Sequence, residues 1–522
     1  MKKSIIGISL LTIACLYTLL SAVVIFLTVL LGGKVLAGII ISLIVLIIQF
    51  LIAPFMTDVI MRSFYKAKFD ENIPDYLEKF IRNVCIKYNM EYPKIGIIHD
   101  GGPNAFTYGR TKNSTRVILT TGLFDLLNEK EVECVIAHEL GHAIHHDMLF
   151  MTTAQIVPLI MYAIFEELTE GDADDIKASA VIGIIAYTLY ILSEYIVLYL
   201  SRTREYYADD FAITETKHPN DLAEALVKIG YGLSIRKRND SHDVSKNNAL
   251  GIFNSKNAKV VAVACISEKG TIDKSRIKNT MKWEKWNPWA VFYEFNSTHP
   301  LIAKRLEAIS KRSHEYRKKP YIEFDLKKEV NYGMYFLMEL MIYFAPIMVF
   351  LLVSVYGIIK NTFPVLQTLS IAYLMSFPFI IIKYIKRHKL KFKKYKVEDL
   401  LSEVKVSNVT TIPCILNGKI IGKGDPGCIF NEDFVIKDDT GIMLLDYNQP
   451  LFILNKIFAV FKSKKYIDAD VKIVGWYRRG PIPYVEICGM TVNKKTKKIY
   501  TYMISLIVYL ILFVSAVIIL TI

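Results

Sequence analysis

The stretch "EVECVIAHELGHAIHHDMLF", residues 131–150, combines a helical apolar pattern with four histidines. Its apolar residues recur at the spacing of one helix face, which predicts a helix packed into a core. Those residues are Val132, Val135, Ile136, Leu140, Ala143 and Ile144. Within the same stretch, His138 and His142 stand four residues apart with Glu139 after the first, which is the pattern H-E-x-x-H. The stretch therefore predicts a buried helix that carries chemistry.

Two histidines four residues apart are separated by about 400° of helical rotation, so His138 and His142 project from nearly the same face. One metal ion can therefore reach both imidazoles. Glu139 lies one residue round the helix, where it can take a proton from an attacking water. The plain alternative is a polar helix whose side chains are only solvated.

A catalytic zinc site needs a third protein ligand and one open position. His145 lies about 10 Å along the helix axis from His138, too far to share an ion with it. A third histidine ten residues after the first is excluded, because Met148 stands there. Glu205, in "SRTREYYADD", is the best candidate because the predicted topology returns it to the side of the motif. Asp209, four residues later, can hydrogen-bond the far nitrogen of a ligand histidine.

The composition is that of a membrane protein, with 52% hydrophobic residues in 522. Runs of about 20 apolar residues are long enough to cross a bilayer. Seven such spans are predicted, at residues 5–31, 35–56, 148–166, 177–200, 333–359, 364–384 and 499–522. Basic clusters beside the spans, among them Arg202 and Arg204, fall on one side, whereas the loop 166–175 is acidic. That basic side is predicted to be cytoplasmic.

The formal charge of +14 does not predict nucleic-acid binding, because the basic clusters adjoin spans, where orientation and anionic lipid explain them. Seven cysteines without a C-x-x-C pair fit a reducing, cytoplasmic side. Between residues 395 and 490, short β-type runs surround D-D-T-G and R-R-G-P turns. This pattern predicts a small, barrel-like β domain between the last spans.

"HELGH", the later "REYYAD", the upstream "PNAF" and the downstream "THP" with an arginine resemble the HtpX-like and CAAX-prenyl-protease-type integral-membrane zinc metallopeptidases. The resemblance covers roughly residues 1–315, including the hairpin of spans between the second histidine and the glutamate. It implies one Zn²⁺ per chain, bound by His138, His142 and Glu205, with Glu139 as the base.

The same resemblance implies residues for the substrate. Asn104 and Ala105 would hold the substrate backbone, although Asn104 could simply form a turn. His299 and Arg305 would stabilise the oxyanion or orient the substrate, with a structural hydrogen bond and a plain ion pair as their alternatives. An edge strand that a peptide can join would consist of Val117, Ile118, Leu119 and Thr120.

The predicted fold class is a multi-pass α-helical membrane protein of about seven spans. It has a cytoplasmic, mainly helical, zincin-like catalytic domain with a small edge β-sheet, and a small C-terminal cytoplasmic β domain. The predicted parts are a transmembrane hairpin at 1–60, the metallopeptidase domain at 61–330 with spans 148–166 and 177–200, a second hairpin at 331–390, the β domain at 391–498 and a last span at 499–522.

The predicted function is a membrane-embedded, zinc-dependent endopeptidase that acts at the cytoplasmic membrane face in quality control of misfolded membrane proteins. Its expected partners are a protein or peptide substrate and membrane lipid, without nucleic acid. The sequence does not indicate an oligomeric state. Two alternatives stay open: processing of a lipid-modified or short peptide substrate, and a non-proteolytic, metal-stabilised membrane scaffold or transporter.

Overall fold

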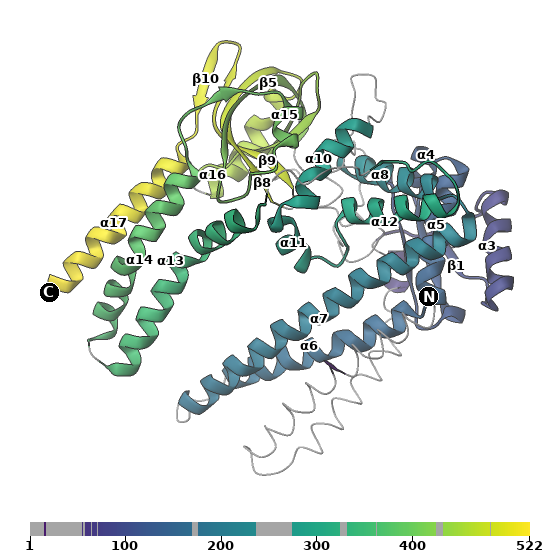
Figure 1. Ribbon diagram of the computed structural model, residues 1–522, viewed down its shortest axis with the longest axis horizontal. Helices are drawn as coiled ribbons and strands as arrows, with labels where there is room; N and C mark the ends of the chain where they lie inside the picture. The colour runs from purple at the N-terminus through teal and green to yellow at the C-terminus, as the bar shows by residue number, and fades with distance from the viewer. Residues whose placement is uncertain are drawn as a thin grey trace. The chain divides into compact units, whose positions relative to one another are not determined.

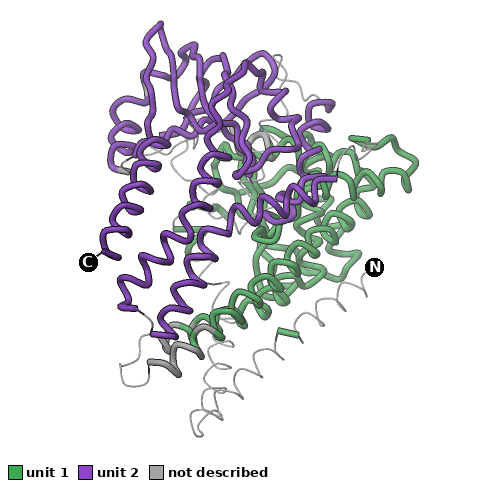
Figure 2. The backbone as a smooth tube through the Cα atoms, turned by 60° about the vertical axis from the view of Figure 1, so that its left-hand side comes forward, with its two compact units in different colours: residues 1–258, 294–323 green, residues 259–293, 324–522 purple. Residues whose placement is uncertain are grey.

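The computed structural model describes residues 15–16, 55, 58–63, 65–69, 71–169, 176–235, 274–323, 331–361, 363–423, 432–450, 452–480 and 482–521. The predicted spans 5–31 and 35–56 lie outside these residues except for single positions. The described residues form two compact units, shown in two colours in Figure 2: residues 1–258 with 294–323, and residues 259–293 with 324–522.

The first unit contains a three-stranded sheet. Its strands are β1 (Lys94–Ile98), β2 (Ala105–Tyr108) and β3 (Arg116–Thr120). The order is β1-β3-β2, with β1 parallel and β2 antiparallel to β3. All five residues of β3 are buried, as expected for an interior strand with a continuous apolar run. The prediction of an edge strand at residues 117–120 is therefore wrong, because β1 occupies the other side of β3.

The described residues of the first unit also form seven helices (Figure 1), of which α5 packs on β2 and α4 adjoins β3. They are α3 (Asp75–Tyr88), α4 (Thr121–Leu126), α5 (Glu129–Ile144), α6 (Asp147–Thr169), α7 (Ile176–Thr216), α8 (Pro219–Ile235) and α12 (Ile302–Glu315). At its start, α5 has a capping box: Asn128 Oδ1 accepts the Glu131 N–H at 3.0 Å, and Glu131 Oε2 accepts the Asn128 N–H at 2.9 Å.

The helix α7 has 41 residues and is therefore about 60 Å long. It is continuous from the predicted span at 177–200 into the region of Glu205 and Asp209. The helix α6 packs along it around a cluster of buried residues: Ala154, Val157, Met161, Val197 and Leu200. One rigid element thus links the predicted span to the predicted third ligand.

The second unit contains a closed β-barrel. Its strands are β4 (Lys393–Lys394), β5 (Ile412–Lys423), β6 (Phe434–Lys437), β7 (Ile442–Asp446), β8 (Asp470–Arg479), β9 (Pro483–Val492) and β10 (Lys495–Lys498). Pairing runs β5-β6-β7-β9-β8 and closes from β8 back to β5. The helix α16 (Phe452–Ile457) lies between β7 and β8. This connectivity is that of an OB-fold, a five-stranded Greek-key barrel.

The second unit also includes residues 259–293, and the described part of this segment packs against the barrel. The sequence predicts these residues to belong to the 61–330 domain. They form α10 (Lys274–Trp286) and the start of α11 (Pro288–Phe295). Trp283 Nε1 donates to the Val406 carbonyl at 2.8 Å, and Arg479 Nη2 donates to the Thr280 carbonyl at 2.8 Å. A short helix of the same unit, α15 (Val397–Ser402), also packs on α10.

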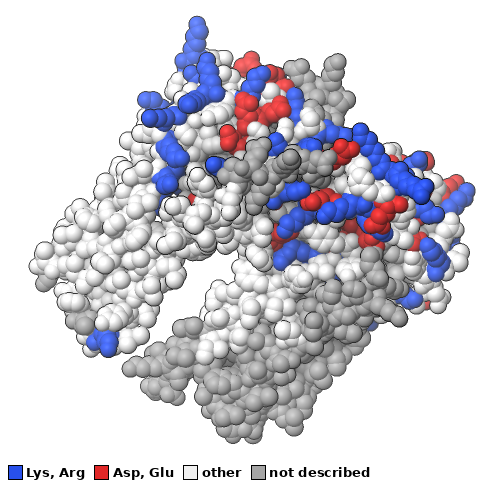
Figure 3. Space-filling view, viewed as in Figure 1, with Lys and Arg blue, Asp and Glu red and all other residues white. Residues whose placement is uncertain are grey.

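Three of the described helices are long and apolar enough to cross a membrane: α13 (Gly333–Lys360), α14 (Val365–Arg387) and α17 (Thr501–Thr521). Figure 3 shows that this part of the second unit carries almost no charged side chains. The helices α13, α14 and α17 agree with three of the seven predicted spans. The apolar part of α6 is shorter, at Asp147–Tyr162, and the remaining spans stay predictions.

Candidate metal centre

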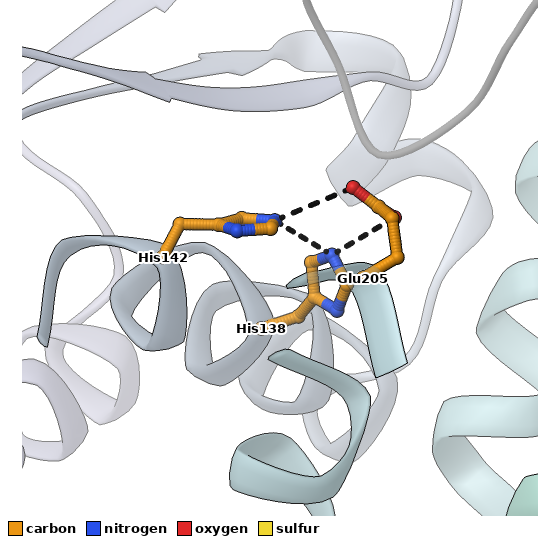
Figure 4. Close-up of side chains that lie close together, drawn as sticks. All are labelled: His138, His142 and Glu205. Atoms are coloured by element: carbon orange, nitrogen blue, oxygen red, sulfur yellow. Dashed lines mark hydrogen bonds and ion pairs between the residues drawn. The ribbon is translucent and has the colours of Figure 1, made fainter. Parts of the chain in front are cut away.

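The side chains of His138, His142 and Glu205 converge on one point (Figure 4). The two histidine Nε2 atoms lie 3.2 Å apart. Glu205 Oε2 is 3.8 Å from the first of them, and Glu205 Oε1 is 3.7 Å from the second. Two ligands bound tetrahedrally to zinc at 2.0–2.1 Å are about 3.4 Å apart, so these distances fit a single ion.

A glycine allows this convergence, because it lets α5 approach α7 closely. A Cβ atom on Gly141 would lie 3.2 Å from the Phe211 side chain and 3.3 Å from the Ala208 backbone. Contacts this short would push the two helices apart. The glycine of "HELGH" therefore sets the distance at which the histidines of α5 meet Glu205 of α7.

Each histidine is held by a carboxylate on its other nitrogen. His138 Nδ1 lies 3.0 Å from Asp209 Oδ1, and His142 Nδ1 lies 2.7 Å from Asp147 Oδ2. A carboxylate at Nδ1 places the ring proton there and leaves Nε2 as a lone pair. Two lone pairs facing each other at 3.2 Å cannot form a hydrogen bond. The arrangement is therefore suited to a cation between them.

Asp147 is a site residue that the sequence did not indicate. It follows His142 by five residues, which is not a helical spacing, and it begins a separate helix. The chain turns between the two helices at His146, whose φ is +59°, in the left-handed region. That turn brings Asp147 back to His142, and Arg204 Nη2 holds its other oxygen at 2.7 Å.

Two residues of the segment 294–323 lie close to Glu205. His299 Nδ1 lies 3.2 Å from Glu205 Oε2, and Arg305 Nη1 lies 3.3 Å from the same oxygen. Arg305 also donates to Asp209, from Nε at 2.8 Å and from Nη2 at 2.7 Å. Arg305 is only 2% exposed. Its guanidinium thus faces carboxylates, which fits orienting Glu205 and Asp209 better than contacting a substrate.

The neighbouring side chains set the charge state of the carboxylates. Burial alone would raise the pKa of Glu205, but His299, Arg305 and His138 lower it below its usual range. The pKa of Asp209 is likewise lowered, because Arg305 and His138 outweigh burial. Both side chains are therefore ionised at neutral pH, as a ligand and an orienting group must be.

The loop that carries His299 is attached to α7 by Arg202. Arg202 Nη1 donates to the carbonyl oxygens of Glu294, Phe295 and Ser297, at 2.8, 3.2 and 2.8 Å. Arg202 and Arg204 belong to the basic residues that predict one side of the membrane. Both are buried, at 8% and 2% exposure, and contact residues beside the site.

Glu139 is 2% exposed, and its Oε1 atom has no hydrogen-bond partner among the described residues. A buried carboxylate oxygen without a partner is costly, and such atoms are expected where a water or ligand binds. Its backbone is tied to the sheet, because Thr107 Oγ1 donates to the Glu139 carbonyl at 3.3 Å. The strand next to the motif is therefore β2.

The substrate-binding residues predicted from the resemblance divide between two strands. Asn104 and Ala105 lie at the start of β2, where Asn104 Oδ1 accepts the Ala105 N–H at 3.0 Å. Val117, Ile118, Leu119 and Thr120 are buried in the centre of the sheet. The Thr120 N–H donates to the Asn104 carbonyl at 3.1 Å. Along an antiparallel strand, residues whose backbone groups face the partner strand alternate with residues whose groups point away from it. Backbone groups of Ala105 and Thr107 therefore point away from β3.

Residues 70–313 match the model of peptidase family M48. The chain is 36% identical over 190 residues to a protease HtpX homolog of Methanothermobacter thermautotrophicus, covering 36% of this chain and 71% of that protein. It is 32% identical over 220 residues to one of Campylobacter hominis, covering 41% and 77%. For one of Pyrococcus abyssi, identity is 33% over 230 residues, covering 42% and 78%.

The crystal structure of Ste24p from S. mikatae is similar over 56% of this chain and 62% of that chain. Sequence identity is 17% and the TM-score is 0.35.

Proposed function

The chain belongs to peptidase family M48 and is similar to HtpX proteases, and on that premise we propose that it is a zinc-dependent membrane endopeptidase. His138, His142 and Glu205 bind the ion. The observation that carries this assignment is the pair of Nε2 atoms, 3.2 Å apart, whose rings are both oriented by carboxylates. The H-H-E donor set with one position left open is typical of catalytic zinc.

Zinc, when bound, supplies a Lewis acid that activates water and polarises a carbonyl. Glu139 receives the proton of the attacking water and passes it to the leaving amine. Its buried and unpartnered Oε1 is available for that transfer. Asp209 and Asp147 hold the two imidazoles, and Arg305 neutralises the carboxylates on α7.

A substrate peptide pairs with the outer edge of β2, rather than with β3. The backbone groups of Thr107 that point away from β3 are available for such pairing, since no other described strand adjoins β2. The Ala105 N–H already donates to Asn104 Oδ1. β-Strand addition at an edge holds a peptide extended and independent of its sequence. Thr107 also contacts the Glu139 backbone, so the edge runs beside the base.

The proposed location of the centre is the cytoplasmic membrane face, and the proposed substrates are cytoplasmic parts of misfolded membrane proteins. The support is the position of Glu205, five residues beyond the predicted span 177–200 on the same continuous helix. A site so close to a span reaches polypeptide near the bilayer. The 391–498 domain is proposed to lie on the same side.

The test uses the purified full chain in detergent, with zinc content measured beside cleavage of reduced, unfolded casein. Glu139→Gln should retain about one zinc per chain and lose cleavage, and Glu205→Ala should lose zinc. Glu133→Gln is the matched control, since Glu133 lies on the same helix and is not part of the site. The proposal fails if Glu139→Gln cleaves as fast as wild type, or if Glu205→Ala binds zinc as tightly.

A further inference from the structure

One face of the helix between β7 and β8 is apolar and exposed, beside the start of a membrane-crossing helix. The helix consists of α16 and the π-helical turn η4 (Phe458–Lys462) that continues it. We propose that this helix lies in the surface of the bilayer that α17 crosses, with its apolar face among the lipids and its lysines on anionic headgroups. This interaction goes beyond the proposed peptidase function and does not depend on it.

The exposed face is formed by four large apolar side chains: Ile453, Leu454, Ile457 and Phe461, exposed to 65%, 39%, 46% and 78%. At about 100° per residue, these positions fall within roughly 100° of arc. The opposite side of the helix packs against the barrel. Phe458 is 2% exposed there, and the centre of its ring lies 4.0 Å from the centre of the Tyr447 ring. The helix is amphipathic, but its outer face is apolar where a water-soluble domain would place polar residues.

This face is not one of many apolar spots on the domain. Among the described residues of 391–498, Ile421 is the only exposed large hydrophobic residue outside the helix. Apolar residues scattered singly over a surface are ordinary, whereas a contiguous group marks an interaction site. The concentration on one helix therefore requires a specific apolar environment.

The position of the membrane on α17 identifies that environment. With 21 residues, α17 is about 31 Å long, close to the roughly 30 Å thickness of a hydrocarbon core. Its first residue, Thr501, must therefore lie at the interface if the helix crosses the bilayer. Thr501 Oγ1 donates to the Asn448 carbonyl, only four residues before α16.

Hydrogen bonds connect this interface position to the helix itself. Asn455, on α16, donates from Nδ2 to Asn448 Oδ1 at 3.0 Å and accepts the Gln449 N–H at 2.7 Å. Pro450 adjoins the first two turns of α17, where a groove of about 220 Å³ is lined by Thr501, Ile504, Ser505, Val508 and Tyr509. The helix that carries the exposed face is thus hydrogen-bonded to the segment that holds the first residue of α17.

Positive charge accompanies the apolar face. Lys462 and Lys465 are exposed, and Lys497 lies over the Phe458 ring at 4.2 Å. The pKa of Lys497 is lowered to about 8, first by burial and then by the charges of Lys462 and Lys465. These lysines repel one another, and anionic headgroups would relieve that repulsion. Figure 3 shows further basic residues over the barrel beside the uncharged helices of the same unit.

The test measures the depth of a spin label at position 461 in the full chain, reconstituted into nanodiscs of equal parts phosphatidylglycerol and phosphatidylcholine. Phe461→Cys is labelled in a chain whose native cysteines are replaced. Oxygen should reach the label more readily than a water-soluble nickel complex does. Lys494→Cys is the control, because Lys494 lies at the far end of β10 from Thr501 and should favour the nickel complex.

The lysines are tested by depth in two lipids. Lys462→Gln with Lys465→Gln should reduce the label depth in anionic nanodiscs and leave it unchanged in pure phosphatidylcholine. A label at 461 that is as open to nickel as the one at 494 overturns the proposal. A label shielded from both reagents overturns it too, since that pattern indicates contact with protein. The measurement does not require peptidase activity, so its result is independent of the metal centre.

Discussion

Asp209 holds two site residues at once: its carboxylate lies 3.0 Å from His138 Nδ1 and 2.7 Å from Arg305 Nη2. His138 comes from α5, Arg305 from α12 and Asp209 from α7. One carboxylate therefore connects three helices and orients the ring of His138, a proposed metal ligand. Glu205, four residues earlier on the same face of α7, belongs to the same network through Arg305.

Replacing Asp209 should weaken metal binding without abolishing it. In Asp209→Asn, the carboxylate that orients His138 and pairs with Arg305 is lost, and such changes cost about 10- to 100-fold in metal affinity. The measurement is zinc retention against a competing chelator. Asp210→Asn is the control, because Asp210 pairs with Arg312 at 2.7 Å, outside the centre. Equal affinities in the two variants would contradict the orienting role.

Freeing the His299 loop should lower the turnover rate while metal content stays intact. Arg202→Met keeps most of the buried stem but removes the donor to three loop carbonyls. Misplacement of a site residue by about 1 Å can cost on the order of 100-fold, so we expect a 10- to 100-fold fall in kcat. Arg312→Met, on the surface of α12, should leave kcat unchanged. A wild-type kcat in Arg202→Met would show that the position of His299 is not needed.

Proline in the outer edge of β2 should impair peptide binding. Thr107→Pro removes an N–H that points away from β3, so the sheet keeps its own ladder. We expect kcat/KM to fall by about tenfold, roughly one lost hydrogen bond, with unchanged zinc content. Thr107→Val is the matched control, because it also loses the bond to the Glu139 carbonyl but keeps the N–H. If both variants behave alike, the peptide does not pair with this edge.

The stability of the barrel should depend on the ionisation of Asp446. Burial, followed by the charge of Glu486 on the neighbouring parallel strand, raises the pKa of Asp446 from 3.8 to about 6. A raised pKa means that its favourable contribution is complete below pH 3.8 and is lost as pH rises through about 6. Asp446→Asn should therefore stabilise the barrel above pH 6, by on the order of 2 kcal/mol.

Hydrogen–deuterium exchange of β7 and β9 amides measures this effect, with variant and wild type compared at the same pH. The difference should vanish near pH 4. Asp468→Asn is the control, since the Asp468 side chain is 76% exposed. A variant no more protected than wild type at pH 8 would mean that Asp446 is not destabilised in the fold.

Sequence by itself determined the parts of the centre that depend on helical periodicity. His138 and His142 are four residues apart on α5, and Glu205 and Asp209 are four apart on α7. A period of 3.6 residues places each pair on one face whatever the rest of the chain does. Hydropathy similarly predicted α13, α14 and α17, because crossing a bilayer requires a length and a composition that are local properties.

Tertiary structure decided what depends on contacts between distant segments. Strand pairing made β3 central and left β2 at the edge, and a pattern of buried residues cannot say which neighbours a strand has. Asp147 reached His142 only because the chain turns through a left-handed residue at His146. Arg202, which the sequence predicts to mark one side of the membrane, also donates to the Glu294 carbonyl in the segment before His299. These outcomes follow from packing between segments far apart in sequence, which local periodicity does not encode.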